Sequence, residues 1–345
     1  MNLLETVKKQ GDPLIKGNTV TFVWEGEFAP QLISDLDGWE NNPQALTQAK
    51  KGVWKLSFEL APNAYLEYAF YDPESKKRFP DPFNKGSVNN GVGGHNHFVY
   101  MPGAAPTPFA QTPEGGLRGK VTRHSVDAEY VTASKRRRIY LYHPPVKVAV
   151  PLLAVYDGLD YFRRGKLTEI VDNLIAAKRI RPLAIAFLQN GGQRARMVEY
   201  GCSQTTLGFL MSQVLPLASK EIKLLDFEKH SGAHGIMGAS MGGLMSVYTA
   251  MSLPEVFGKA LSQSGAFELW EHDSTVMQMV RHFPKTNIKL WLDCGAMDFL
   301  LEANRVMAAL LKEKGYAVTY CENGGAHNYN TWRDSCVSGL ETLFG

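Results

Sequence analysis

Cysteine is scarce in this sequence. The 345 residues include four cysteines, none of which forms a Cys-x-x-Cys pair or a Cys/His pair with the spacing of a zinc site. A disulfide-stapled scaffold and a structural zinc module are therefore excluded, and we expect free thiols in a reducing compartment with no bound metal. The four positions are Cys202, Cys294, Cys321 and Cys336.

An excess of charge of one sign is also missing, because 37 lysines and arginines stand against 34 aspartates and glutamates, for a net charge of +3. The charges are scattered, so no polyanion or nucleic acid partner is predicted. The one basic run, at 135–138, leads directly into the apolar and aromatic residues of 139–142, which is typical of a strand entered from a charged turn.

Long apolar runs are absent as well. The longest, at 148–156 and 182–188, fall well short of the roughly 18 residues that a membrane span needs. Residues 1–11 lack the apolar core of a secretory signal. These absences predict a soluble, cytoplasmic protein without a membrane partner.

The composition is that of a globular protein, with 44% hydrophobic, 11% aromatic and 21% charged residues, and the length allows one or two packed cores. Residues 18–101 show short aromatic or β-branched runs separated by turn residues, which predicts a small antiparallel β-sandwich. Residues 102–119 contain four prolines and several glycines, as an extended linker does. We therefore predict a sandwich domain at 1–103, a linker at 104–119 and a second domain at 120–345. The sandwich strands are expected at 19–24, 53–58, 65–71 and 98–100.

The second domain alternates apolar strand-like runs with amphipathic helical windows, a pattern typical of an α/β fold. No internal repeat is visible. Strands are expected at 138–142, 152–156, 183–188, 235–237, 259–262, 289–293 and 318–322, and helices at 168–177, 206–217, 243–251 and 301–314.

The sequence Gly-Ala-Ser-Met-Gly at 238–242 matches the pattern Gly-x-Ser-x-Gly, in which small flanking residues let a strand and a helix meet in a strained turn. A strand-like segment precedes it and a helix-like segment follows, so the context of a nucleophile elbow is present. We expect Ser240 to be a catalytic nucleophile. A serine hydroxyl is a weak nucleophile at neutral pH, so it requires a base to accept its proton and an acid to orient that base.

In the fold that contains such an elbow, the acid and then the base follow the serine along the chain. Three histidines come after Ser240. His272 and His282 precede the last pair of predicted strands, whereas His327 lies in the loop directly after the final strand, where the base belongs.

The acid is expected after the strand at 289–293, where two aspartates are available. Asp298, in the loop before the next helix, is the preferred candidate, and Asp293 at the end of the strand is the alternative. Asp298 also suits the cap of that helix, and the two roles are compatible.

A tetrahedral intermediate needs two backbone N–H donors for its oxyanion. The amide of Met241, directly after the nucleophile, is one expected donor, and the amide of Leu159, in the loop after an early strand, is the other. Asp-Gly at 157–158 is also a common turn dipeptide, so a simple turn is the alternative there.

Several separated blocks match a known family in order. They are Tyr-Asp-Gly at 156–158, Gly-Ala-Ser-Met-Gly-Gly-Leu at 238–244, Pro-Glu-Val-Phe at 254–257, Ser-Gln-Ser-Gly at 262–265 and Gly-Ala-His-Asn-Tyr-Asn-Thr-Trp at 325–332. Residues 120–345 thereby resemble the putative-esterase family of α/β-hydrolases, which includes enterochelin esterases, feruloyl esterases, S-formylglutathione hydrolases and mycolyltransferases. The resemblance implies an α/β-hydrolase fold, a triad of Ser240, His327 and Asp298, and no cofactor.

The N-terminal part has its own resemblance. Ser-Asp-Leu-Asp-Gly-Trp at 34–39 and the strand around Trp54 make it similar to early-set, immunoglobulin-like modules related to glycogen-binding modules. Such a module implies a role in carbohydrate contact or self-association. A carbohydrate platform needs exposed aromatic rings, whereas Trp24, Trp39 and Trp54 are expected to pack in the core or between domains.

The stretch at 189–200 is similar to the enterochelin-esterase branch of the family, where an arginine-to-glutamate block follows a strand. The resemblance implies that Arg194 or Arg196 faces an anionic substrate. The alternative is that one of them pairs with Glu199 and orders the loop. Trp270 is expected either to line the acyl pocket or to pack in the interior.

Together these patterns predict a serine carboxylic ester hydrolase that acts through an acyl-enzyme on a small-molecule ester and needs no metal or organic cofactor. The resemblance favours a siderophore esterase, with a feruloyl or acetyl esterase and an acyltransferase as alternatives that use the same triad. A carbohydrate-binding protein with an inactive hydrolase domain is the non-enzymatic alternative, which the presence of all three triad residues disfavours.

Overall fold

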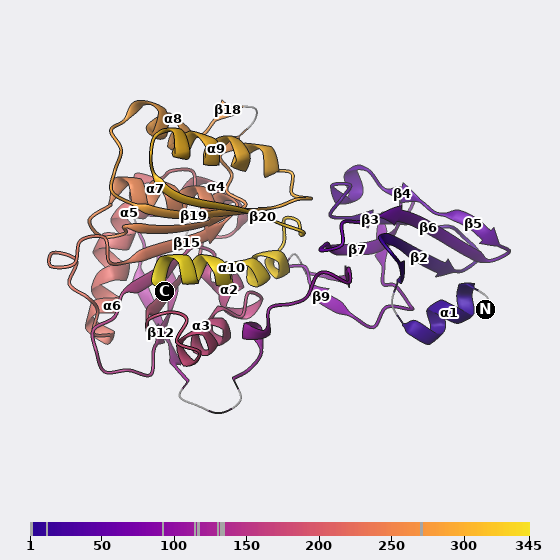
Figure 1. Ribbon diagram of the computed structural model, residues 1–345, viewed down its shortest axis with the longest axis horizontal. Helices are drawn as coiled ribbons and strands as arrows, with labels where there is room; N and C mark the ends of the chain where they lie inside the picture. The colour runs from indigo at the N-terminus through magenta and orange to yellow at the C-terminus, as the bar shows by residue number, and fades with distance from the viewer. Residues whose placement is uncertain are drawn as a thin grey trace. The chain divides into compact units, whose positions relative to one another are not determined.

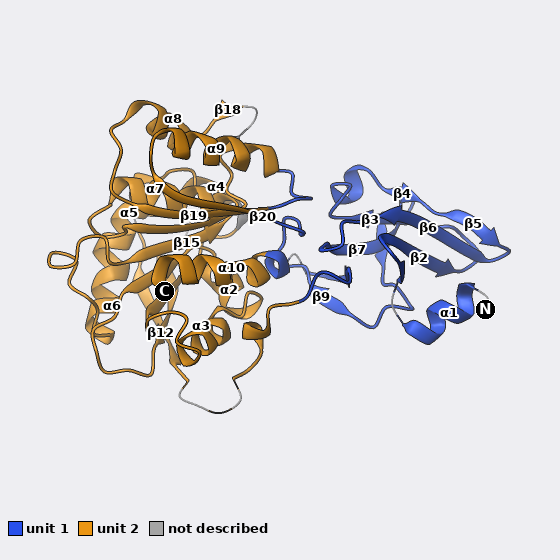
Figure 2. Ribbon diagram, viewed as in Figure 1, with its two compact units in different colours: residues 1–105, 295–299, 323–331 blue, residues 106–294, 300–322, 332–345 orange. Residues whose placement is uncertain are grey.

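The computed structural model describes residues 3–11, 13–91, 93–113, 115, 118–129, 131, 135–269 and 272–345 (Figure 1). The chain forms two compact units (Figure 2). Unit 1 comprises Met1–Ala105 together with two short loops, Gly295–Phe299 and Asn323–Thr331, and unit 2 comprises the remainder. The domain ranges inferred from the sequence do not anticipate that these two loops belong with the N-terminal residues.

Unit 1 contains two antiparallel sheets, preceded by helix α1 (Leu3–Gln10). Exposure alternates residue by residue along β6 (Val53–Glu59), so one face of its sheet is turned inward. The inward faces share one core, which includes Phe22, Leu32 and Leu66, and the two sheets therefore form a sandwich. The first sheet has the order β1 (Leu14–Lys16), β2 (Thr19–Glu25), β6, β5 (Thr47–Lys50), and the second has the order β4 (Gln44–Ala45), β3 (Gln31–Ser34), β7 (Tyr65–Asp72), β10 (His95–Tyr100), β9 (Ser87–Asn89), with β8 (Lys77–Phe79) paired to β7.

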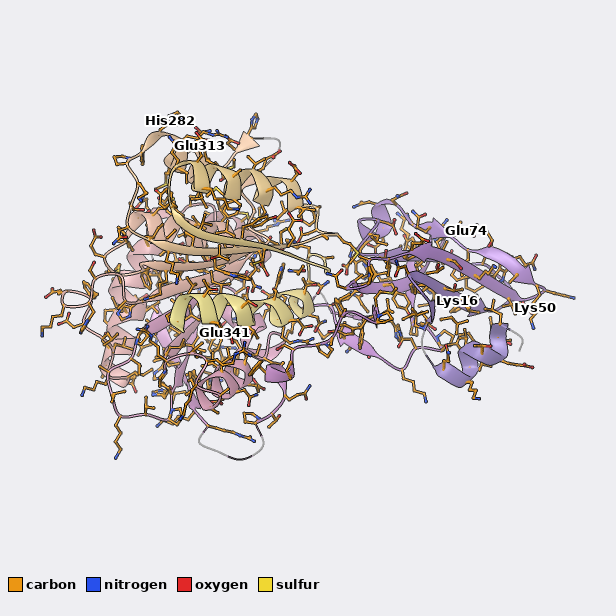
Figure 3. The ribbon with its side chains drawn as sticks, in the orientation of Figure 1. Lys16, Lys50, Glu74, His282, Glu313 and Glu341 are labelled. Carbon is orange, nitrogen blue, oxygen red and sulfur yellow. The ribbon has the colours of Figure 1, made fainter. Side chains whose placement is uncertain are left out.

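The three tryptophans of unit 1 all have contacts within it. The Trp24 ring lies 5.1 Å from the Phe70 ring, and the Trp54 indole N–H donates to the Gly26 carbonyl at 3.1 Å. The guanidinium of Arg78 lies 4.8 Å from the centre of the Trp39 ring. Charged side chains such as Lys50, at the end of β5, project outward from the sandwich (Figure 3).

Unit 2 is built on an eight-stranded mixed sheet. Its central strands are buried along their whole length, as expected for parallel strands with helices on both faces. The pairs β13–β14, β13–β15, β15–β16 and β16–β19 are parallel, whereas β12 pairs antiparallel with β11 and β14. The strand order is β11 (Lys120–Asp127), β12 (Arg136–His143), β14 (Ala184–Leu188), β13 (Leu152–Val155), β15 (Gly235–Ala239), β16 (Lys259–Gln263), β19 (Lys289–Gly295), β20 (Ala317–Asn323).

Helices connect these strands (Figure 1). The most deeply buried is α7 (Met241–Ser252), in which residues 241–251 are all buried and largely small or apolar. Among the described residues, none of the helices has the length and apolar character that a membrane span requires. The other helices are α2 (Gly158–Arg163), α3 (Leu167–Ala176), α4 (Gln193–Glu199), α5 (Gln204–Phe209), α6 (Leu215–Glu221), α8 (Thr275–His282), α9 (Leu301–Glu313) and α10 (Tyr329–Phe344), and a short ribbon is formed by β17 (Glu268–Leu269) and β18 (His272–Asp273).

The predicted fold class is confirmed: an antiparallel β-sandwich precedes an α/β domain with a mixed sheet. The helix predicted at 206–217 corresponds to α5 and α6 joined by a π-helical turn at Leu210–Val214. The proline-rich segment from Pro106 onward packs within unit 2, where the Asn173 side chain donates to the carbonyls of Phe109 and Gln111.

Candidate active site

Ser240 lies in the turn between β15 and α7. Its backbone has φ 58° and ψ −124°, a strained conformation for a residue with a side chain. The turn requires glycine at 238, because a Cβ there would lie 2.4 Å from the Gly242 carbonyl oxygen. The Ser240 N–H donates to the Gln263 carbonyl at 2.9 Å, and the Ser240 carbonyl accepts from the Ala266 N–H at 3.1 Å. The backbone of the elbow is therefore fixed from both sides.

The loops that follow β19 and β20 bring Asp298 and His327 together. The Nδ1 atom of His327 lies 2.9 Å and 3.1 Å from the two carboxylate oxygens of Asp298. The Asp298 side chain is fully buried, whereas the imidazole is 22% exposed. Because Nδ1 faces the carboxylate, Nε2 lies on the opposite side of the ring, which is the arrangement a general base needs.

Backbone hydrogen bonds join these two loops. The Ala296 N–H donates to the Asn323 carbonyl at 2.8 Å, and the Met297 N–H donates to the Gly325 carbonyl at 3.0 Å. The segments that follow β19 and β20 are thus tied together next to the Asp298–His327 pair. The Phe299 ring lies 4.6 Å from the imidazole and is 78% exposed, so the base has an exposed aromatic neighbour.

The predicted oxyanion loop begins with Asp157, whose φ of 51° is left-handed, and continues into α2. This loop lies against the start of α7, because a Cβ built on Gly242 would lie 3.3 Å from the Tyr156 Cβ. Leu159 and Met241 occupy the first turns of α2 and α7. The first amides of a helix have no intrahelical acceptor, so both N–H groups are of the kind that an oxyanion uses.

An ion pair between a half-buried arginine and a buried aspartate fixes the oxyanion loop. The Arg196 guanidinium, on α4, donates from Nε at 2.8 Å and from Nη2 at 2.6 Å to one carboxylate oxygen of Asp157, and Nη2 also lies 3.3 Å from the Ala239 carbonyl. The Asn190 side chain donates to the other carboxylate oxygen at 2.5 Å. Arg196 thereby links the oxyanion loop to the residue before the nucleophile, a contact that sequence spacing does not reveal.

The remaining predicted residues have varied surroundings. Arg194 is exposed on α4. Glu199 forms a buried ion pair with Arg137, a residue of the basic run that lies within β12. Trp270 lies outside the described residues.

The two other histidines after Ser240 are both exposed. His272 lies in β18, and His282 ends α8 at the outer edge of unit 2 (Figure 3). In the described part of the chain, no three His, Cys, Asp or Glu side chains are grouped so that they could hold a metal ion.

A mixed sheet with a strained serine turn at the end of a central parallel strand is the architecture of an α/β-hydrolase. A model of the family described as "Putative esterase" matches residues 132–343, so the chain belongs to the putative-esterase family. Its relatives and its fold support the same class of enzyme, a carboxylic ester hydrolase.

Known proteins are similar over most of the chain. The Iron(III) enterobactin esterase of Escherichia coli K12 is 21% identical over 88% of this chain and 82% of its own length. That of Dickeya dadantii is 27% identical over 98% and 92%. The crystal structure of ferric enterobactin esterase from Salmonella typhimurium has a TM-score of 0.82 at 19% identity, covering 96% and 95% of the two chains. A ferulic acid esterase structure has a TM-score of 0.57 at 17% identity and covers 66% of this chain and 97% of its own.

Proposed function

We propose that this esterase uses Ser240 as nucleophile, His327 as general base and Asp298 as the acid that orients the base. The main support is the hydrogen-bonded pair of Asp298 and His327 at 2.9 Å. Further support comes from the sheet, in which β15, β16, β19 and β20 are consecutive neighbours. Because β15, β16 and β19 are parallel, their carboxyl ends lie at the same edge of the sheet, and the elbow follows β15 as the loop of Asp298 follows β19.

In the proposed reaction the Ser240 Oγ attacks the ester carbonyl while His327 Nε2 accepts its proton. The amides of Leu159 and Met241 stabilise the oxyanion of the tetrahedral intermediate. The intermediate collapses to an acyl-enzyme as the imidazolium returns the proton to the leaving alcohol. Water, deprotonated by His327, then attacks the acyl-enzyme, and the imidazolium returns the proton to the Ser240 Oγ as the carboxylic acid product leaves. Asp298 stabilises the imidazolium in both halves of the cycle.

For the substrate we propose an ester of an aromatic N-acyl serine, as in a catecholate trilactone. Two relatives are named Iron(III) enterobactin esterase, and one solved relative was crystallised with 2,3-dihydroxy-N-benzoyl-serine. In this chain the exposed Phe299 ring beside His327 suits an aryl group. Arg194 is exposed and suits an anionic catecholate, whereas the charge of Arg196 is already opposed by Asp157.

A feruloyl ester is the second candidate. It also presents an aryl group to Phe299, and a ferulic acid esterase structure is similar to this one over 66% of the chain. An acyltransferase would use the same three residues and differ in its acceptor, so products must be examined with and without an added alcohol.

The test compares the wild type with Ser240→Ala on p-nitrophenyl esters from acetate to octanoate, a feruloyl ester and a catecholate trilactone. We expect the wild type to prefer the trilactone and the variant to lose all turnover above background. Full activity in Ser240→Ala would refute the serine mechanism. A preference for the feruloyl ester would refute the proposed substrate but leave the mechanism intact.

A further inference from the structure

The loop that contains His327 is hydrogen-bonded to the N-terminal sandwich. Within unit 1 (Figure 2), the Tyr65 N–H at the start of β7 donates to the Gly324 carbonyl at 3.0 Å. The approach is so close that a Cβ at 324 would lie 2.1 Å from the Asn63 carbonyl oxygen, and glycine is therefore required there. The loop at 323–331, here called the histidine loop, packs directly on the end of a sandwich strand.

Two asparagines of the histidine loop extend these contacts. The Asn328 side chain donates to the Asp35 carboxylate at 3.0 Å. The Asn330 side chain donates to the Tyr65 hydroxyl at 2.8 Å and to the Glu67 carboxylate at 2.9 Å. Glu67 is 2% exposed, and hydrogen bonds from a neutral donor to a buried carboxylate are among the stronger ones in proteins.

The histidine loop transmits this anchorage to the imidazole through its own hydrogen bonds. The Asn328 N–H donates to the Ala326 carbonyl at 2.9 Å, so the backbone turns tightly around His327. The Thr331 N–H donates to the Asn328 side chain at 2.9 Å, and the Ala326 N–H donates to the Thr331 hydroxyl at 3.2 Å. Fixing Asn328 therefore fixes the backbone on both sides of the histidine.

Asp298, the proposed acid, is also held in place by the sandwich. Met297, next to Asp298, packs against the core of the sandwich and donates its N–H to the Gly325 carbonyl of the histidine loop. Both members of the Asp298–His327 pair thus lie one residue away from a side chain that the sandwich holds.

The contact between the histidine loop and the sandwich is made by polar and charged side chains, which is unusual where packing alone is needed. Asp35 and Glu67 are two carboxyl groups in one buried polar cluster, where Asn96 also donates to Glu67 at 2.8 Å. Burial, together with the nearby Glu67 charge, raises the pKa of Asp35 well above its usual value. Apolar side chains of similar size commonly give equal or greater stability at such a place, so stability alone does not explain the cluster.

We propose that the N-terminal sandwich is a positioning module for the catalytic base, in which Asp35, Tyr65 and Glu67 hold His327 through Asn328 and Asn330. The inference rests on the proposed function in one respect, that His327 is the base. Asp35, Tyr65 and Glu67 are positioning residues that act through the histidine loop. The module's role is thereby assigned to catalysis rather than to carbohydrate contact.

The decisive experiment uses the full-length chain with Asn330→Ala and Asp35→Ala. We expect kcat to fall about 10- to 100-fold, because a misplacement of about 1 Å in a catalytic group has an effect of that size. KM should stay within about threefold of the wild-type value.

A matched control is Asn84→Ala. Asn84 is a buried asparagine of the same sandwich that donates to the Tyr68 hydroxyl and the Phe98 carbonyl, both at 2.9 Å, and none of these three residues belongs to the histidine loop. We expect it to lower the melting temperature without lowering kcat. An equal loss of kcat in Asn84→Ala, or an unchanged kcat in both test variants, would overturn the proposal.

Asp35→Asn serves as the conservative variant, because the amide oxygen still accepts from Asn328. It should recover most of the kcat that Asp35→Ala loses, and it decides the question if Asp35→Ala does not fold. A fall in Asp35→Asn as large as in Asp35→Ala would count against the proposal. Failure of the proposed mechanism has a different signature, namely turnover that survives in Ser240→Ala.

Discussion

Ser240 lies in a turn whose shape is set within five residues, whereas the loop of His327 is held by a hydrogen bond between positions 293 residues apart. At the elbow, the close approach of Gly238 to Gly242 and the backbone bonds from neighbouring strands leave one conformation. At the histidine loop, polar side chains from the sandwich have that function. Ser240 is thus fixed by local sterics and backbone hydrogen bonds to Gln263 and Ala266, and the loop of His327 is fixed by side-chain hydrogen bonds from distant residues.

The largest effect is expected from a substitution in the Asp298–His327 pair, which lies in the loops that distant hydrogen bonds hold. Asp298→Asn keeps the shape of the acid but loses its charge and favours the wrong imidazole tautomer, so kcat should fall about 10³- to 10⁴-fold. Asp293→Asn is the matched control, because Asp293 lies in β19, the strand that precedes the Asp298 loop, and is also buried. Steady-state kinetics should show kcat near the wild-type value for the control. The reverse order would make Asp293 the acid.

The elbow is broken by Gly238→Ala, whose added methyl would meet the Gly242 backbone at 2.4 Å. We expect about a 100-fold loss of kcat and a loss of a few kcal/mol in the free energy of unfolding, measured by urea denaturation. Gly208→Ala in α5 is the control, since a Cβ there meets nothing within 4 Å and alanine is the better helix former. Equal behaviour of the two variants would show that the elbow tolerates the methyl group.

The two units should also differ in how pH affects their stability. Burial lowers the pKa of His234, in unit 2, to about 4, and its Nδ1 accepts a hydrogen bond from the Leu152 N–H at 3.0 Å. The unfolded state therefore binds a proton before the folded state does, and stability should fall by about 3 kcal/mol as the pH drops from about 6.5 to 4.

In unit 1 the pKa of Asp35 is raised, so the pH dependence of stability has the opposite sign there. The contribution of Asp35 to the free energy of unfolding is lost as the pH rises above the pKa that this carboxyl group has in the unfolded chain. Urea unfolding of His234→Gln at several pH values should show a flatter acid limb than the wild type, and the exposed neighbour His230→Gln should not. An identical acid limb in all three proteins would rule out His234 as its source.

The smallest effect separates two arginines of α4. Arg196→Gln removes the bidentate contact to Asp157 and should lower kcat about tenfold, because the oxyanion loop loses its anchor. Arg194→Gln should instead raise KM for an anionic ester, with kcat little changed. Kinetics on a neutral and an anionic ester would distinguish them. A change in KM alone for Arg196→Gln would make that residue a substrate contact.

The sequence predicts the locally determined features best. The elbow has a motif because its sterics demand small residues at fixed spacing, and the central strands are apolar runs because both faces are buried. The edge strand β11 was not predicted, since its exposed and half-buried residues include Lys120, Thr122 and His124 rather than an apolar run. Asp35 and Asn330 are ordinary polar residues in the sequence, and no spacing links residues so far apart.

The separation of these segments along the chain also determines when Asp298 and His327 come together during folding. Unit 1 combines residues 1–105 with loops at 295–299 and 323–331, so it remains incomplete until residue 331 has left the ribosome. Contacts that close such long loops have a high entropic barrier and form late in folding. In a refolding experiment the sandwich strands and the sheet would give their spectroscopic signals first. Esterase activity would return afterwards, as the step that joins segments far apart along the polypeptide.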